Sequence, residues 1–124
     1  MRIDLHIHTR PKSPCSAIDP SALLEAARQS GLEGICLTEH QNRWADGEVR
    51  EWAKSSGTRI FQGNEITTSQ GDILVFGLDR DVKGVVPIQD LRQEVEPAED
   101  YPQNAPKMWA AGLVRSGFAH PADC

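Results

Sequence analysis

His6 and His8, in the opening segment MRIDLHIHT, are the residues of this chain best suited to chemistry. Successive side chains of an extended strand point to opposite faces, so Asp4, His6 and His8 share one face. The apolar residues between them share the other face and are expected to pack in a core: Ile3, Leu5 and Ile7. Two imidazoles and a carboxylate on one face lie within reach of a single ion. The spacing therefore predicts a metal site built on one strand.

Histidine recurs at the ends of other predicted strands. The four histidines of the chain are His6, His8, His40 and His120, and each falls at or just before the C-terminal end of a strand. Functional groups of parallel α/β sheets and barrels gather at this edge, because the loops there converge on one mouth. Glu65, in GNEIT, adds a carboxylate. Such ligands suit zinc, manganese or iron, and a bridging carboxylate can hold two ions.

Each of these residues also has an ordinary explanation when it is taken alone. An HxH pair is compatible with a polar strand face exposed to water. His40 is compatible with a surface loop, His120 with a strand end before Pro121, and Glu65 with a solvated carboxylate. The metal site is therefore an inference from the whole set.

The elements that must position these residues alternate between strand and helix. Strands are predicted at 2–8, 34–38, 58–62 running into 63–66, 73–78 and 113–120, with 73–78 pairing with 66–68 as a hairpin. Helices are predicted at 20–30, 46–56, 87–95 and 106–111. Asp19 and Asp46 are the expected N-caps of the first two helices, and Gly31 and Gly57 follow their ends. Alternating strands and short loops predict an α/β fold with a mainly parallel sheet or a barrel segment.

Composition narrows the classes of function. With 124 residues the chain is at most one domain, and its net charge of -5 argues against a nucleic-acid partner, which needs a basic surface. No apolar run approaches the roughly 20 residues of a membrane span, and no signal-peptide pattern is present, so a cytoplasmic location and no membrane partner are expected. Three cysteines without a CxxC pair argue against a disulfide framework. Cys36, in the apolar run GICL, is expected to be buried packing.

Four segments together resemble a known family. DLHIHT at 4–9, LTEH at 37–40, GNEIT at 63–67 and AHP at 119–121 are similar to the successive N-terminal motifs of the PHP (polymerase and histidinol phosphatase) family. The resemblance implies a distorted (β/α)7 barrel with two or three divalent metal ions at its mouth, and many family members hydrolyse phosphate esters. It covers residues 1–124 as a single PHP-like domain.

The resemblance also implies a role for each motif residue. His6 and His8 are expected to bind the first metal ion, and Glu65 to bridge it to another. His40 is expected to contribute to the second ion, and His120 to the third.

The chain departs from the family pattern at several places. Glu39 stands in TEH where the family usually has TDH, which keeps the carboxylate but lengthens its reach. Asp4 is expected to orient a ligating imidazole from behind. The loop RPKSPCSAID has no carboxylate before Asp19, where many members supply a further ligand. Cys15 in that loop is either a thiolate ligand or a small packed residue.

The resemblance leads us to expect a chain truncated after the AHP motif. The later histidine and the DxH pattern of the family do not occur before Cys124, so this chain corresponds to about the N-terminal half of the barrel. An open half-barrel leaves a strand edge unpaired, and self-association through that edge is therefore expected.

The leading hypothesis is a metal-dependent phosphoesterase that hydrolyses a small phosphorylated metabolite or nucleotide by attack of metal-bound hydroxide. A side-chain nucleophile has less support, because Ser13, Cys15 and Ser16 have no recognisable base partner, and neither a GxSxG elbow nor a Walker loop occurs. One alternative is a catalytically inert metal-binding fragment or interaction module. Another is a nuclease or proofreading-type PHP module.

Overall fold

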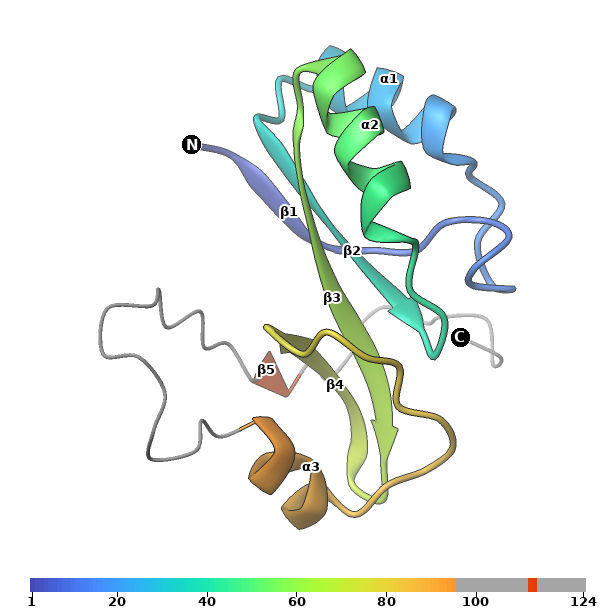
Figure 1. Cartoon of the computed structure of the whole chain (residues 1–124), viewed down its shortest axis with the longest axis vertical. Coiled ribbons are helices and arrows are strands. Elements are labelled where there is room, and N and C mark those ends of the chain that lie inside the picture. The colour runs from blue at the N-terminus through green and yellow to red at the C-terminus, as the bar shows by residue number, and fades with distance from the viewer. Residues whose placement is uncertain (96–111, 114–124) are drawn as a thin grey trace.

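Three parallel strands and a hairpin form one continuous sheet in the computed structural model, which describes residues 1–95 and the backbone of residues 112–113 (Figure 1). The elements are β1 (Ile3–Ile7), α1 (Pro20–Gln29), β2 (Gly34–His40), α2 (Asp46–Ser56), β3 (Arg59–Thr68), β4 (Gly71–Phe76), α3 (Ile88–Val95) and β5 (Gly112–Leu113). The strand order is β1-β2-β3-β4-β5. The first three strands are parallel, whereas β4 and β5 are each antiparallel to the preceding strand. The α/β prediction is confirmed.

Helix α1 begins and ends where the sequence predicts. The Asp19 side chain accepts a hydrogen bond from the Ala22 N–H at 3.0 Å, and Pro20 occupies the first helical position. Gly31, just beyond the end of the helix, adopts a left-handed φ of 69°.

Helix α2 begins differently from the prediction. Its N-cap is Ala45, with no side-chain hydrogen bond, and Asp46 is the first helical residue. The Asp46 carboxylate instead accepts a hydrogen bond from Gln62 Nε2 at 2.9 Å, because β3 passes beside the start of the helix. The expectation that Asp46 caps α2 is therefore wrong. The predicted end is confirmed by Gly57, whose φ is 72° and whose N–H donates to the Ala53 carbonyl.

Helices α1 and α2 lie on the same side of the parallel strands (Figure 1). Their apolar faces pack against alternate residues of β2, and the buried members of this first core cluster are Leu23, Ala27, Ile35, Leu37 and Val49. Strand β2 lies between β1 and β3 and is buried over six of its seven residues. Cys36 is free and buried, so its predicted packing role is confirmed.

Strand β3 continues past its parallel neighbour into an antiparallel hairpin with β4. Ile66 pairs with Ile73, which confirms the predicted hairpin, although β3 is one strand running to Thr68. A second core cluster lies here, and its buried members are Ile66, Ile73, Val75, Val82 and Leu91. Gly63 allows the close approach of the two strands, because a Cβ at this position would lie 2.8 Å from the Val75 carbonyl oxygen.

Strand β1 is at the edge of the sheet and is irregular. Its register with β2 shifts between Asp4 and Ile7, which interrupts the simple alternation of faces. Leu5 is half exposed, so the prediction that it packs in the core is wrong. Ile7 does pack against the first core cluster, as predicted.

The last predicted elements fall mostly outside the described residues. The helix at 106–111 is not covered, and of the strand at 113–120 only Leu113 is described, as the end of β5. Within residues 1–95 and 112–113, no helix has the length and apolar character needed to cross a membrane.

Candidate metal centre

Four of the five predicted ligands meet at the C-terminal ends of the parallel strands. The Nε2 atoms of His6 and His8 lie 2.8 and 2.7 Å from Glu65 Oε2, and 3.0 Å from each other. His40 Nε2 lies 3.5 Å from the same carboxylate oxygen. His120 lies outside the described residues, so its expected place at the rim stays a prediction.

The parallel register of the strands explains this convergence. His40, the last residue of β2, is paired directly with Glu65 of β3, so their side chains leave the sheet side by side on one face. The other two imidazoles come from the edge of the sheet, His6 from within β1 and His8 from the residue that follows it. The rings of His8 and His40 stack with centroids 4.5 Å apart, and His6 meets His8 edge-on at 4.9 Å.

Burial and hydrogen bonds set the charge of the centre. Burial works to raise the pKa of Glu65, but the hydrogen bonds from His8 and His6 outweigh it and lower this pKa to about 2. Burial also lowers the pKa of His40, against the attraction of Glu65. At neutral pH the site therefore contains an ionised carboxylate beside a neutral His40 imidazole.

The donor set fits a divalent cation. The ligand atoms of His6, His8 and Glu65 lie within 4.8 Å of one another, close enough to share one ion. His40 Nε2 lies beside this group, 3.5 Å from Glu65 Oε2. His40 Nε2 is buried and, among the described residues, has no hydrogen-bond partner. Such an orphaned atom is costly unless a further ligand satisfies it. Three imidazole nitrogens and a carboxylate suit zinc, manganese or iron.

A second group of potential ligand atoms lies beside the first. The side chains of His8, Cys15 and His40 place one ligand atom each within 4.8 Å of one another. Cys15, however, is disulfide-bonded in the structure, and a disulfide sulfur is not the thiolate that binds metals. We therefore restrict the candidate set to His6, His8, His40 and Glu65.

Two acidic residues of the motifs, Glu39 and Asp4, form hydrogen bonds next to the candidate ligands. Glu39 is buried, and its carboxylate accepts hydrogen bonds from the Thr9 N–H, the Thr9 hydroxyl and the Trp44 indole N–H. Asp4 accepts a hydrogen bond from the backbone N–H of His6 at 3.0 Å, so its support for His6 passes through the backbone.

Ser13 also lies next to the candidate ligands, a position that the sequence does not predict. Its hydroxyl lies 3.3 Å from His8 Nδ1. Ser13 is fully buried and therefore not placed to attack a substrate. Its only sequence signal is its position in the loop after the HxH pair.

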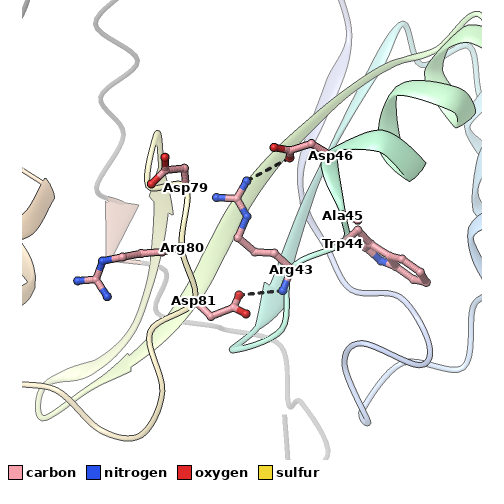
Figure 2. A pocket seen from close by; sticks show the side chains of 7 residues that line it. All are labelled: Arg43, Trp44, Ala45, Asp46, Asp79, Arg80 and Asp81. Atoms are coloured by element: carbon pink, nitrogen blue, oxygen red, sulfur yellow. Dashed lines mark hydrogen bonds and ion pairs between the residues drawn. The ribbon is translucent and has the colours of Figure 1, made fainter.

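A polar pocket of about 260 Å³ lies between the loop after β2 and the loop after β4. Figure 2 shows Arg43 held on two sides, with its guanidinium toward Asp46 and its backbone N–H donating to Asp81 at 2.9 Å. Arg80 is paired with Glu94. Because both arginines that line the pocket have protein partners, we read it as a junction between loops rather than an anion site.

The fold and the centre define a class of protein: an α/β domain with imidazoles and a carboxylate clustered where its parallel strands end. The PHP domain model matches residues 4–104, and the chain belongs to this family. The described structure is accordingly part of a PHP-type (β/α) barrel, and members of the family are generally metal-dependent phosphoesterases.

An uncharacterized protein of Methanocaldococcus jannaschii is 30% identical over 103 residues, an alignment that covers 75% of this chain. The alignment covers 60% of the relative, so the chain spans less than two thirds of the relative's length.

Proposed function

We propose that this protein is a metal-dependent phosphoesterase that hydrolyses a small phosphorylated metabolite or nucleotide. The observation that carries the proposal is the convergence of three imidazole Nε2 atoms on Glu65 Oε2 at 2.7 to 3.5 Å. Membership of the PHP family supports the reaction class. The net charge of -5 favours a small substrate over a polyanionic nucleic acid.

Glu65 and the three histidines would have different roles in such a metal site. A divalent cation bound here supplies Lewis acidity, which lowers the pKa of water toward about 7 and offsets negative charge on phosphate oxygens. Glu65 contributes the negative charge that attracts the cation, because its low pKa keeps it ionised. His6, His8 and His40 contribute nitrogen donors at the C-terminal ends of β1 and β2 and would hold the cation there.

The first experiment measures metal and activity together on the full-length protein. We expect elemental analysis to find bound zinc, manganese or iron, and we expect hydrolysis of a generic phosphomonoester with added manganese. Glu65→Gln keeps the size of the side chain but removes its charge. It should lower metal affinity by more than about 100-fold, beyond the usual effect of residues that only support ligands, and abolish turnover.

The matched control makes the same chemical change at an exposed site. Glu25→Gln breaks the surface pair with Arg28 on α1 and should leave metal content and activity unchanged. Wild-type protein that binds no divalent metal, or Glu65→Gln protein that retains full activity, would refute the proposal. Metal binding without turnover on any phosphomonoester would favour the inert metal-binding alternative.

A further inference from the structure

We propose that Ser13 is a positioning residue that links the buried Glu39 carboxylate to His8 and fixes the proton of the His8 imidazole on Nδ1. The inference deepens the proposed function, because the nitrogen left free, Nε2, is the one that faces Glu65 in the candidate metal centre.

The argument begins with the three partners of the Ser13 hydroxyl. Ser13 Oγ contacts a Glu39 carboxylate oxygen, lies 3.1 Å from the backbone nitrogen of His40, and lies 3.3 Å from His8 Nδ1. A hydroxyl has one proton to donate and two lone pairs that accept. All three partners are therefore satisfied only if one of them accepts and the other two donate.

The roles of two partners are fixed by their chemistry. The Glu39 carboxylate accepts hydrogen bonds from the backbone N–H of Thr9 and the indole N–H of Trp44, so we assign it as an acceptor for Ser13 as well, and the Ser13 proton is directed to Glu39. The backbone nitrogen of His40 only donates, so it occupies one lone pair of Ser13 Oγ. The remaining lone pair accepts from His8, and His8 Nδ1 must carry a proton.

The opposite arrangement leaves acceptors facing each other. If Ser13 donated to His8 Nδ1, its oxygen would meet the Glu39 carboxylate with no proton between them, at the closest of its three contacts. Ser13 and Glu39 are both almost fully buried, so water does not compensate for that repulsion.

Surrounding donors hold Glu39 in place for this role. The Thr9 N–H lies 3.0 Å from both Glu39 oxygens, and the Trp44 Nε1–H lies 3.3 Å from one of them. Thr9 is fully buried as well. The carboxylate is therefore a fixed acceptor, and Ser13 transmits its position to the imidazole.

The position of the proton on Nδ1 determines what the other ring nitrogen of His8, Nε2, can bind. With Nδ1 held by Ser13, Nε2 is the nitrogen of His8 that faces Glu65 Oε2, 2.7 Å away. Without a metal ion this contact is a hydrogen bond, and a bound metal ion would take the place of its proton. The Glu39–Ser13–His8 chain thereby keeps His8 ready to bind a metal ion through Nε2.

The first test measures the affinity of the full-length protein for Zn²⁺ by titration calorimetry. Ser13→Ala should weaken Zn²⁺ binding by about 10- to 100-fold, the usual range for residues that orient metal ligands. Ser13→Thr keeps the hydroxyl and should restore most of the affinity. Thr68→Val is the matched control, since it removes a buried hydroxyl that donates to the Gly71 carbonyl, outside the Glu39–Ser13–His8 chain, and it should bind Zn²⁺ nearly as wild type.

The second test is independent of metal binding. Long-range ¹H–¹⁵N spectra of the metal-free protein report which ring nitrogens of His8 are protonated. We expect a protonated Nδ1 in the wild type and in Thr68→Val, and a shift toward protonation on Nε2 alone in Ser13→Ala.

The two tests separate the two proposals. A wild-type His8 with an unprotonated Nδ1 would overturn the inference whatever the metal result. Unchanged Zn²⁺ affinity and an unchanged His8 spectrum in Ser13→Ala would overturn it as well. Wild-type protein that binds no Zn²⁺ but shows the expected spectra would refute the metal-dependent function and leave the hydrogen-bond chain standing.

Discussion

The parallel half of the sheet and the antiparallel half are built on different kinds of buried group. The parallel half, β1 to β3 with α1 and α2, combines an apolar core with a buried polar cluster at its C-terminal edge. The antiparallel half, β4 and α3 packed on the end of β3, has an apolar core of its own. The buried polar residues at the parallel edge are Thr9, Ser13, Thr38, Glu39, Asn64 and Glu65.

The buried polar groups that form the candidate centre, and their cost in stability, are therefore confined to the parallel half. Burying charged and polar groups is costly unless they are hydrogen-bonded, and in the parallel half Thr9, Ser13 and Glu39 bond to one another. Two buried atoms there, His40 Nε2 and Asn64 Oδ1, have no hydrogen-bond partner among the described residues.

The antiparallel half supports the network from outside, because β3 runs through both halves. A second link joins the loops, where the Gly84 N–H donates to Gln41 Oε1 and the Arg43 N–H donates to Asp81.

The largest expected effect tests whether the antiparallel half serves only stability. Leu91, on α3, is buried in the second core cluster, and Leu91→Ala should lower the free energy of unfolding by roughly 2 to 5 kcal/mol. Chemical denaturation measures this loss. Zn²⁺ affinity of the protein that remains folded should not change, because Leu91 has no place in the polar network. A parallel loss of affinity would show that the two halves are not separable.

A smaller effect is expected where the two halves meet. Gly63→Ala places a Cβ 2.8 Å from the Val75 carbonyl oxygen and 2.9 Å from a Phe76 ring carbon, so β4 must shift. We expect a loss of about 1 to 3 kcal/mol in denaturation. Zn²⁺ affinity should also fall, since Glu65 lies two residues further on the same face of β3.

Gly47→Ala is the control for this change. A Cβ at Gly47, in α2, meets no heavy atom within 4 Å, and alanine is the better helix former. Its stability should be equal to or above that of the wild type. If Gly63→Ala destabilises the protein but leaves Zn²⁺ affinity intact, β3 does not transmit strain from one half to the other.

The smallest effect concerns a helix cap and depends on pH. Hydrogen bonds from the Ser21 hydroxyl and the Ala22 N–H lower the pKa of Asp19 below its ordinary 3.8. A carboxyl group whose pKa is lowered by folding stabilises the folded state above its unfolded pKa, and this contribution is lost as pH falls through the folded pKa. Asp19→Ala should therefore lower the thermal midpoint slightly at neutral pH, and the difference should vanish in acid.

Asp90→Ala, on α3, tests whether negative charge at a helix start is enough to explain the effect of Asp19 on α1. It removes an exposed carboxylate from the first turn of α3. We expect a smaller effect on the thermal midpoint than for Asp19→Ala. An equal effect for the two variants would mean that the charge at a helix start, rather than the cap geometry of Asp19, stabilises α1.

Local signals explain what the sequence predicts well. The pair Asp19-Pro20 and Gly31 specify α1 through backbone preferences that act within a few residues. The convergence of His40 and Glu65 is predictable because parallel strands place their C-terminal ends at one edge.

The predictions that fail depend on neighbours distant in sequence. Asp46 is not the N-cap of α2 because Gln62 of β3 engages its carboxylate. Leu5 is exposed because β1 lies at the sheet edge and its register shifts. The role of Ser13 requires Glu39, which is 26 residues away in the chain. None of these contacts leaves a periodic pattern in the sequence.

The strand order has a consequence for how the protein folds. Each described strand pairs with the strand that precedes it in the chain, so the sheet can grow in the order in which its strands are synthesised. The three imidazoles and the carboxylate of the candidate centre all lie within the first 65 residues of the chain. A growing chain therefore has all four groups of the candidate centre before the hairpin partner of β3 is synthesised, and we expect a metal ion to favour this early intermediate by binding it.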